Sequence, residues 1–156
     1  MEAKPGVIDF LNTVLTNELT AINQYFVHAE LCKNWGYERL YRTFRDFSIS
    51  EMRDAEELIE HILYLEGVPN MQRLGQVLVG EAVPEQLQLT LQQERQAVNT
   101  LREAITHCAQ VGDYTTRNKL EEMVREEEEH IDWLETQLAT IRQVGVENYL
   151  SQQIRE

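Results

Sequence analysis

Apolar residues recur at the spacing of an α-helix in four long stretches of this sequence, and this pattern restricts the fold more than any other feature. In the first stretch, Leu11, Val14 and Leu15 fall on one helical face. Only 7 Gly and 3 Pro interrupt the 156 residues, which leaves few turns for a sheet. We therefore predict an all-α fold. The expected helices cover Val7 to about Lys33, Leu40 to Leu65, Pro84 to Gly112 and about Thr116 to Gly145.

The segment between the second and third helices, from Gly67 to Val83, is long for a compact helical protein. A crossover of this length lets the third helix start beside the beginning of the second and run parallel to it. Beyond Gly145, the apolar residues Val146, Tyr149 and Leu150 indicate a short fifth helix. We expect one domain over residues 1–156, built as a four-helix bundle with a long crossover and a short C-terminal helix.

The charge balance narrows the choice of partners. The formal net charge is -13, from 14 Lys and Arg against 27 Asp and Glu. Such a chain repels a phosphate backbone and attracts cations, so we expect no nucleic-acid partner. No apolar run approaches the ~20 residues that span a bilayer, and the N-terminus has no signal-peptide pattern, so we expect no membrane partner and a cytoplasmic location. Cys32 and Cys108 form no CxxC pair and are expected to be reduced and buried.

The two halves of the sequence resemble each other at an offset of 76 residues. The offset relates the first and second predicted helices to the third and fourth, which makes the two helical hairpins pseudo-equivalent. Matching side chains are then expected around a common bundle axis. The paired positions include Glu18 with Glu94, Cys32 with Cys108, Gly36 with Gly112, and Glu51 with Glu127.

Acidic residues fall at these repeat-related places within apolar surroundings. Glu127 and His130 stand at positions i and i+3 of the fourth helix, so they share a helix face. The repeat places Glu51 and Asp54 in the same relation on the second helix. Glu18 and Glu94 supply one acid each from the first and third helices. Every helix of the bundle therefore directs a carboxylate toward the interior.

Buried carboxylates without a counter-charge cost several kcal/mol each. Two divalent cations would balance four glutamates, and a mixed set of oxygen and imidazole ligands suits iron or manganese. The pattern of single Glu residues on two helices and Glu-x-x-His on the others is typical of di-iron carboxylate bundles, although one of the two His positions is missing here. The alternative is that these acids lie on solvated faces of a metal-free bundle that binds other proteins, which would leave the clustering unexplained.

Four segments of the sequence closely resemble bacterioferritin. They are NELTAINQYFVHAE at Asn17–Glu30, ILYLEGVPN at Ile62–Asn70, EEHIDWLETQL at Glu128–Leu138 and GVENYLSQQI at Gly145–Ile154. The resemblance implies a ferritin-like fold, a hollow homo-oligomeric cage of twenty-four subunits built from dimers, oxidation of ferrous iron at a di-iron centre within each subunit, and storage of ferric mineral inside the cage. By matching positions, it assigns the iron-ligand roles to Glu18, Glu51, Glu94, Glu127 and His130.

Met52 follows Glu51 and lies about 100° away from it around the helix, so it cannot face the same metals. The resemblance implies that Met52 and its twofold mate bind one haem b between two subunits. An alternative is a methionine that packs at a dimer interface through its flexible side chain. The haem pocket implied by the resemblance contains Leu19, Ile22, Asn23, Phe26, Ile49 and Ile59.

Asp54 departs from the family pattern, because bacterioferritins normally have histidine at this position. The principal reading is an iron-storage ferroxidase that oxidises ferrous iron with oxygen or peroxide, with Asp54 as a possible sixth ligand. The rival reading is a haem-bearing cage subunit whose oxidation of iron is impaired and which works with a second, competent bacterioferritin subunit. By resemblance, a small associated ferredoxin would deliver electrons to the haem.

Overall fold

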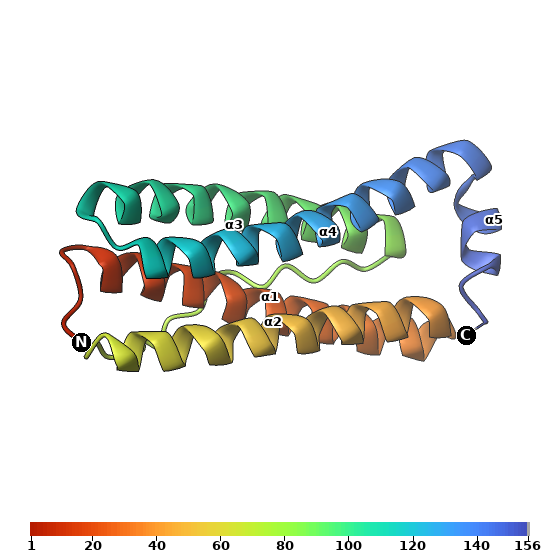
Figure 1. Cartoon of the computed structure of the whole chain (residues 1–156). Coiled ribbons are helices and arrows are strands. Elements are labelled where there is room, and N and C mark those ends of the chain that lie inside the picture. Colours follow the sequence, from red (N-terminus) through yellow and green to blue (C-terminus); the bar gives the residue numbers. More distant parts are fainter. Residues whose placement is uncertain (156) are drawn as a thin grey trace.

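The computed structural model describes residues 1–155, in which five helices and no strands occur. Four long helices lie side by side as a bundle, and a short fifth helix crosses one end (Figure 1). The all-α prediction and the order of the helices are confirmed. The elements are α1 Val7–Trp35, α2 Glu38–Tyr64, α3 Val83–Val111, α4 Tyr114–Val144 and α5 Val146–Ser151.

The chain forms two antiparallel hairpins, α1 with α2 and α3 with α4. The hairpins meet mainly through α1 and α3, which pack directly against each other. Between the hairpins, the crossover of residues 65–82 runs the length of the bundle and returns the chain to the end where α2 begins (Figure 1). As predicted, α3 therefore runs parallel to α2.

Small differences from the predicted boundaries have local causes. Helix α4 begins at Tyr114, before the first apolar position, because the Asp113 side chain caps it by accepting a hydrogen bond from the Thr116 N–H at 3.0 Å. Helix α2 begins at Glu38, where the first residues are polar and leave no apolar period to detect. Helix α1 ends at Trp35, and the capping residue Gly36 lies in the left-handed region (φ 88°), where the absence of a Cβ removes the steric cost.

Two apolar clusters fill the bundle, one toward each end. The first joins the start of α1 to the end of α2 and to the facing parts of α3 and α4, and it includes Leu11, Leu15, Ile62, Leu101 and Leu120. The second joins the other ends of the helices and includes Tyr25, Leu40, Phe44, Leu87 and Leu134. The middle of the bundle is left for polar side chains.

A row of polar side chains on α1 holds the crossover in place. The five residues are spaced four apart, so they follow one edge of the helix. Their partners lie in order along the crossover, and most are backbone groups: the Thr20 hydroxyl, for example, accepts from the Gly75 N–H at 2.8 Å. A Cβ on Gly75 would lie 2.9 Å from that hydroxyl oxygen, which explains the glycine. The row, called the α1 ladder below, is Asn12, Thr16, Thr20, Gln24 and His28.

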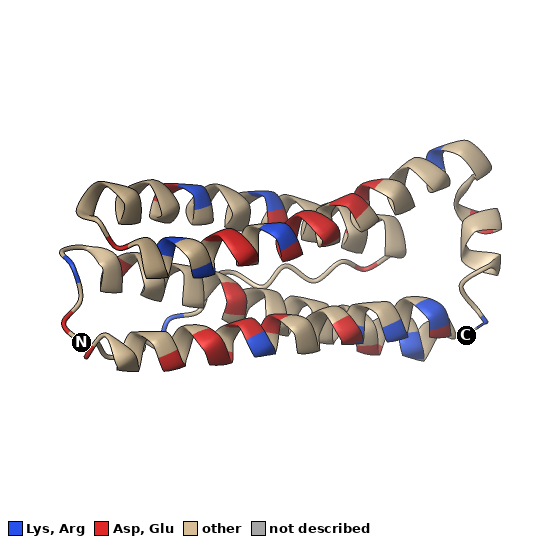
Figure 2. Cartoon of the chain, viewed as in Figure 1, with Lys and Arg blue, Asp and Glu red and all other residues tan. Residues whose placement is uncertain are grey.

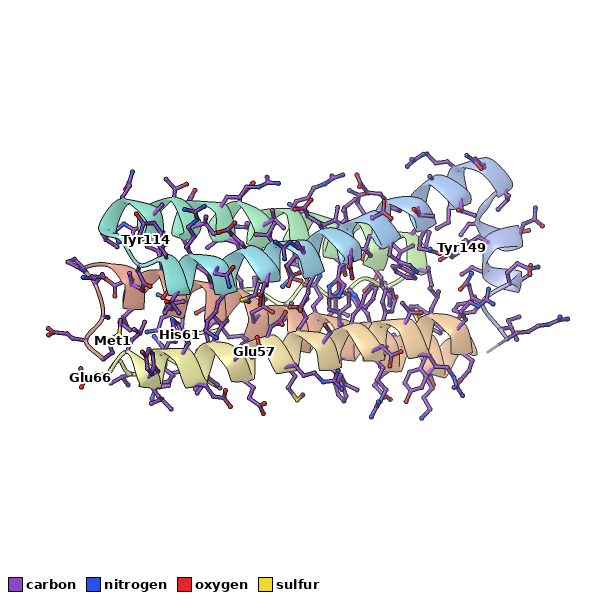
Figure 3. The ribbon with its side chains drawn as sticks, viewed as in Figure 1. Met1, Glu57, His61, Glu66, Tyr114 and Tyr149 are labelled. Carbon is purple, nitrogen blue, oxygen red and sulfur yellow. The ribbon has the colours of Figure 1, made fainter. Side chains whose placement is uncertain are left out.

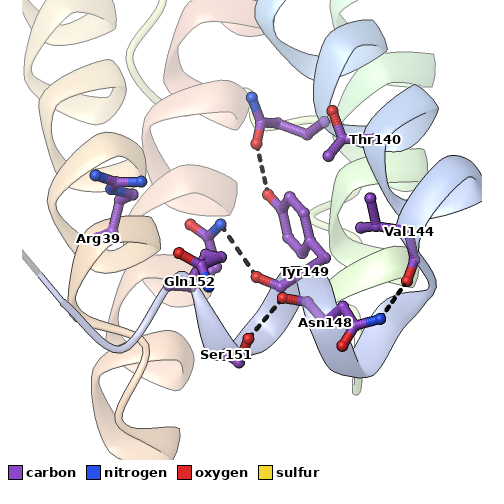
Figure 4. A pocket seen from close by; sticks show the side chains of 9 residues that line it. Arg39, Thr140, Val144, Asn148, Tyr149, Ser151 and Gln152 are labelled. Carbon is purple, nitrogen blue, oxygen red and sulfur yellow. Dashed lines mark hydrogen bonds between the residues drawn. The ribbon is translucent and has the colours of Figure 1, made fainter.

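Helix α5 is anchored to the bundle through Tyr149, which is buried and donates a hydrogen bond from its hydroxyl to Gln137 Oε1 at 2.7 Å. The backbone N–H of Arg39 donates to the Gln153 carbonyl at 2.9 Å, so the chain end also contacts α2. Figure 4 shows the pocket that these residues border, and Figure 3 shows Tyr149 at the opposite end of the molecule from Met1 and His61. No helix in residues 1–155 is long and apolar enough to cross a membrane.

Candidate metal centre

One glutamate from each long helix lies in the middle of the bundle, between the two apolar clusters. Each helix turns these residues inward because its apolar neighbours one turn away face the same core. Their side chains are almost fully buried, with a relative exposure of 1% for each glutamate and 6% for the one histidine beside them. Most other acids are exposed or half-buried, and Figure 2 shows acidic positions spread along the long helices. The buried residues are Glu18, Glu51, Glu94, Glu127 and His130.

The carboxylates form two overlapping groups, in each of which the possible ligand atoms lie within 4.8 Å of one another. Glu51 and Glu127 belong to both groups. Two ions held in this arrangement would be bridged by two carboxylates. The first group is Glu51, Glu94, Glu127 and His130, and the second is Glu18, Glu51, Asp54 and Glu127.

The imidazole of His130 faces the first group. Its Nδ1 lies 3.0 Å from Glu51 Oε1, 3.8 Å from Glu127 Oε2 and 4.0 Å from Glu94 Oε2. Neither Nδ1 nor the nearest carboxylate oxygen of Glu51 has a hydrogen-bond partner. The ring is held from behind by stacking on Phe47, with ring centroids 4.1 Å apart. These atoms converge on a common point, an arrangement that fits a metal ion.

Burial and mutual repulsion alter the protonation of the centre. Removal from water raises the pKa of Glu18, Glu51 and Glu94 well above the usual range, and the neighbouring carboxylates raise it further. Burial likewise raises the pKa of Glu127 to about 8. The pKa of His130 is lowered to about 4 by burial, so the ring is neutral at pH 7 and offers a lone pair. Without cations, the carboxylates are held partly protonated.

Asp54 lies at the second group, with 4% of its surface exposed. Its Oδ2 is buried and has no hydrogen-bond partner. Burial raises its pKa to about 8, and the nearby carboxylate of Glu126 raises it as well. The aspartate is thus placed beside the other acids of the centre. This placement makes it available as a ligand and adds a fifth negative charge.

Tyr25 is a neighbour of the centre that the sequence pattern did not single out. Its ring meets His130 edge-on at 5.9 Å between centroids, and its buried hydroxyl lies beside the Glu94 carboxylate. Burial and the nearby Glu94 raise the pKa of this hydroxyl well above its usual value. Tyr25 lies seven residues after Glu18, two turns along the same helix face, and that spacing was the available signal.

Met52 lies on the outer surface of α2, with a relative exposure of 55%, whereas the adjacent Glu51 is buried. This agrees with the expected 100° separation of the two side chains. The other positions proposed around a haem lie on α1 and α2 and are exposed or half-buried. Phe26 and Asn23 are exposed, and Leu19, Ile22, Ile49 and Ile59 are half-buried.

The other histidines and the cysteines lie outside the centre. His28 is buried and accepts a hydrogen bond from the Gly80 N–H at 2.9 Å, while His61 pairs with the Thr116 hydroxyl at 2.7 Å. His107 contacts the Pro5 carbonyl at 2.6 Å. All three are hydrogen-bonded to protein groups. Cys32 and Cys108 are buried free thiols, as predicted.

Comparison with known proteins gives consistent results. The family model for the ferritin-like domain matches residues 8–144. A bacterioferritin of Streptomyces coelicolor is 46% identical over 156 residues, which is 100% of this chain and 93% of the relative. Bacterioferritins of Mycobacterium leprae and Rhodobacter capsulatus are 45% and 41% identical, over 97% and 96% of this chain and 96% and 92% of their own length.

The raised carboxyl pKa values predict an unusual pH dependence for the metal-free protein. Glu127 titrates near 8 in the folded chain and near its ordinary value of 4.5 when unfolded, so the folded state holds more protons between these values. Stability therefore falls as pH rises through this window. Thermal unfolding should show Tm falling by at least a few degrees, since ~1 kcal/mol corresponds to ~2–4 °C at this size.

Adding Co²⁺ at the upper end of the window should restore the lost stability, because the cation replaces the protons. The Glu127→Gln variant should show a weaker dependence of Tm on pH. A Tm that rises steadily across the window in the metal-free protein would contradict this account of the centre.

Proposed function

The chain belongs to the ferritin-like family and, within it, to the bacterioferritins, and on this basis we propose that it stores iron by oxidising ferrous ions at the centre of the bundle. The observation that carries this proposal is the pair of overlapping ligand groups that share Glu51 and Glu127. A single buried ion would need only one such group. Two ions side by side can give up two electrons to one oxidant.

In this proposal the ferrous ions are substrates, and the protein residues hold them in place. Glu51 and Glu127 bridge the two ions. Glu94 and His130 complete one position, and Glu18 completes the other, with Asp54 beside it. The four glutamates carry -4 and two ferrous ions carry +4, so the buried charge balances when the site is filled. Oxygen or peroxide accepts the electrons.

The proposal extends to a closed cage of twenty-four copies that stores ferric mineral in its interior and resides in the cytoplasm. Its support in this chain is apolar surface that one subunit leaves exposed. These residues lie on the outer faces of α1 and α2 and along the crossover. They include Phe26, Leu63, Val68, Met71 and Leu74. Burial of such surface between copies would remove it from water.

The proposal predicts that the purified protein oxidises added ferrous iron rapidly and that Glu127→Ala lowers the initial rate at least ~100-fold. Loss of a bridging carboxylate should exceed the 10- to 100-fold effect typical of groups that only support a ligand. Stopped-flow absorbance and oxygen consumption measure the rate. Glu128→Ala is the matched control, since Glu128 is an exposed glutamate on the same helix. Equal rates in both variants would exclude this centre as the site of oxidation.

A second candidate function is favoured by Asp54. When Asp54 is ionised, the five carboxylates of the centre carry a total charge of -5, against +4 from two ferrous ions. Aspartate is also shorter than histidine, so an ion at this position must move toward α2 or lose that ligand. On this reading the chain is a haem-bearing cage subunit with slow oxidation of iron, assembled with a second, competent bacterioferritin subunit.

Asp54→His should increase the initial rate of iron oxidation, because it removes the excess charge and supplies the longer neutral ligand. The extra negative charge of the natural residue should favour ferric iron once formed and slow its release from the centre. Stopped-flow oxidation and iron occupancy at both positions measure the two effects. If the substitution changes neither, Asp54 does not limit the centre.

We further propose that haem b binds between Met52 and its counterpart in a twofold-related copy. The thioether is exposed on the outer face of α2, as a ligand shared between subunits must be, and Phe26 exposes an aromatic ring on α1. Haem supplies one-electron chemistry at this interface, and an associated ferredoxin would be its electron donor. The side chains that would bind the macrocycle and exclude water from it are those of Leu19, Ile22, Asn23, Phe26, Ile49 and Ile59.

Met52→Leu should abolish haem binding while leaving the rate of iron oxidation unchanged, because Met52 is exposed on the surface of α2 and Glu51 is buried about 100° away around the helix. Leucine conserves volume and removes only the sulfur ligand. Haem content and the absorption spectrum of the purified protein give the readout. Unchanged haem content and spectrum in the variant would rule out Met52 as the ligand.

A further inference from the structure

A pocket with a volume of about 480 Å³ opens between the end of α2 and the start of α4, and it is called the α2/α4 pocket below. Most of its lining side chains are charged or can bind a cation. His61 lies ten residues after Glu51 on α2, which places it ~15 Å along the helix from the metal centre. Figure 3 shows Glu57 and His61 along this part of α2. The lining residues that matter here are Glu57, Glu60, His61, Tyr64, Lys119 and Glu122.

The hydrogen bonds around His61 determine which of its ring nitrogens carries the proton. The Thr116 hydroxyl donates its only proton to Asp113 Oδ2 at 2.6 Å, so toward His61 Nε2, at 2.7 Å, it can only accept. Nε2 therefore carries the proton of the neutral ring, and Nδ1 holds a lone pair. Among the described residues, no group donates a hydrogen bond to Nδ1. Burial and the nearby Lys119 lower the pKa of His61, so the ring is neutral at pH 7.

The His61 ring is also fixed in its orientation. The side chain is only 6% exposed, and the Tyr64 ring stacks on it with centroids 5.8 Å apart. On the side of Nε2, Thr116 is itself held by Asp113, which accepts from both its hydroxyl and its backbone N–H. Histidines that bind metals usually donate their second ring N–H to an oxygen in this way, which fixes the tautomer and the direction of the lone pair. The lone pair of His61 is thus prepared for a ligand.

Three glutamates surround this lone pair on the walls of the pocket. Glu57 precedes His61 by one turn of α2 and shares its helix face, while Glu122 comes from α4. All three glutamates are exposed, so they can turn toward an ion without disturbing the core. Their charges and the Lys119 ammonium leave a net charge of -2 in the pocket, which one divalent cation balances. An imidazole nitrogen with carboxylate oxygens suits Zn²⁺, Fe²⁺ or Co²⁺, whereas Ca²⁺ takes oxygen ligands alone.

We propose that the α2/α4 pocket is a second cation site, in which His61 Nδ1 and the carboxylates of Glu57 and Glu122 hold one divalent transition-metal ion. Glu60 adds negative charge at the rim of the pocket. The site is separate from the metal centre and does not depend on the oxidation of iron there. Because Glu57 and Glu122 belong to different hairpins, the ion joins α2 to α4 at this end of the bundle.

The first test is a titration of the metal-free, full-length protein with Co²⁺, followed by visible absorption and by the number of ions bound per subunit. Crystals grown with Co²⁺ locate each ion by anomalous diffraction. His61→Gln removes the imidazole and keeps an N–H that can donate to Thr116. His107→Gln is the matched control, because His107 lies on α3 outside the pocket and contacts the Pro5 carbonyl.

The second test changes only exposed charges, so it does not depend on the folding of a variant at the buried His61. Glu57→Gln removes one negative charge and one ligand from the pocket. Glu128→Gln is its matched control, because Glu128 is an exposed glutamate outside the pocket. Lys119→Gln removes the positive charge that opposes the ion.

The wild-type protein should bind one Co²⁺ per subunit beyond those at the metal centre, with an anomalous peak beside His61 Nδ1. The affinity for this ion should fall at least ~100-fold in His61→Gln, since even groups that only support a ligand contribute 10- to 100-fold. It should fall about tenfold in Glu57→Gln and rise about fivefold in Lys119→Gln. Both controls should bind it as the wild type does.

Absence of the additional ion from the wild-type protein would overturn the proposal, whatever the metal centre binds. An additional ion whose affinity is unchanged in His61→Gln would also overturn it, because the site would then lack its nitrogen ligand. Equal losses in Glu57→Gln and Glu128→Gln would show a general attraction of cations to the acidic surface and would overturn it as well.

Discussion

Repulsion among the buried carboxylates is the constraint around which the bundle is arranged. Four glutamates and Asp54 converge where no cationic side chain is found among the described residues of the centre. Two apolar clusters lie on either side and hold the helices together against this repulsion. The apolar burial that stabilises the bundle is therefore concentrated toward its ends, and the middle is left as a polar chamber. Such a chamber accepts either protons or cations. The raised pKa values of Glu127 and Asp54 mean that, without cations, these carboxylates bind protons more readily than they would in water.

The fold was predictable from the sequence because each long helix repeats its apolar residues over many turns. The spacing of Glu127 and His130 showed that two polar groups share a face, and the internal repeat indicated where Glu18, Glu51 and Glu94 lie. Helical periodicity shows on which face of a helix a residue lies, but not which residues of other helices that face contacts. It could not show that Glu51 and Glu127 belong to two overlapping groups, because that depends on how the two hairpins dock.

The sequence did not show the route of the crossover either, because helical periodicity does not identify contacts between distant segments. Asn12, Thr20 and His28 recur at intervals of four residues, a signal that is visible in the sequence once the partner is known. Taken singly, they resemble ordinary polar residues on a solvated face. Tyr25 was missed because a tyrosine among apolar residues at helical spacing resembles an ordinary core residue, and only the coordinates place its hydroxyl beside the Glu94 carboxylate. The sequence was therefore a better guide to the charged side chains of the centre than to uncharged side chains that act only through hydrogen bonds.

The two overlapping ligand groups divide unevenly between the hairpins. One group takes three of its members from α3 and α4 and one, Glu51, from α2. The other takes three from α1 and α2 and one, Glu127, from α4. Helices α2 and α4 also contact each other through aromatic side chains, since Phe47 stacks on His130 and Phe44 meets the ring of Trp133 edge-on. Ions in both positions would act as further cross-links between the two hairpins. The rigidity of the bundle would then depend on how many ions the centre holds.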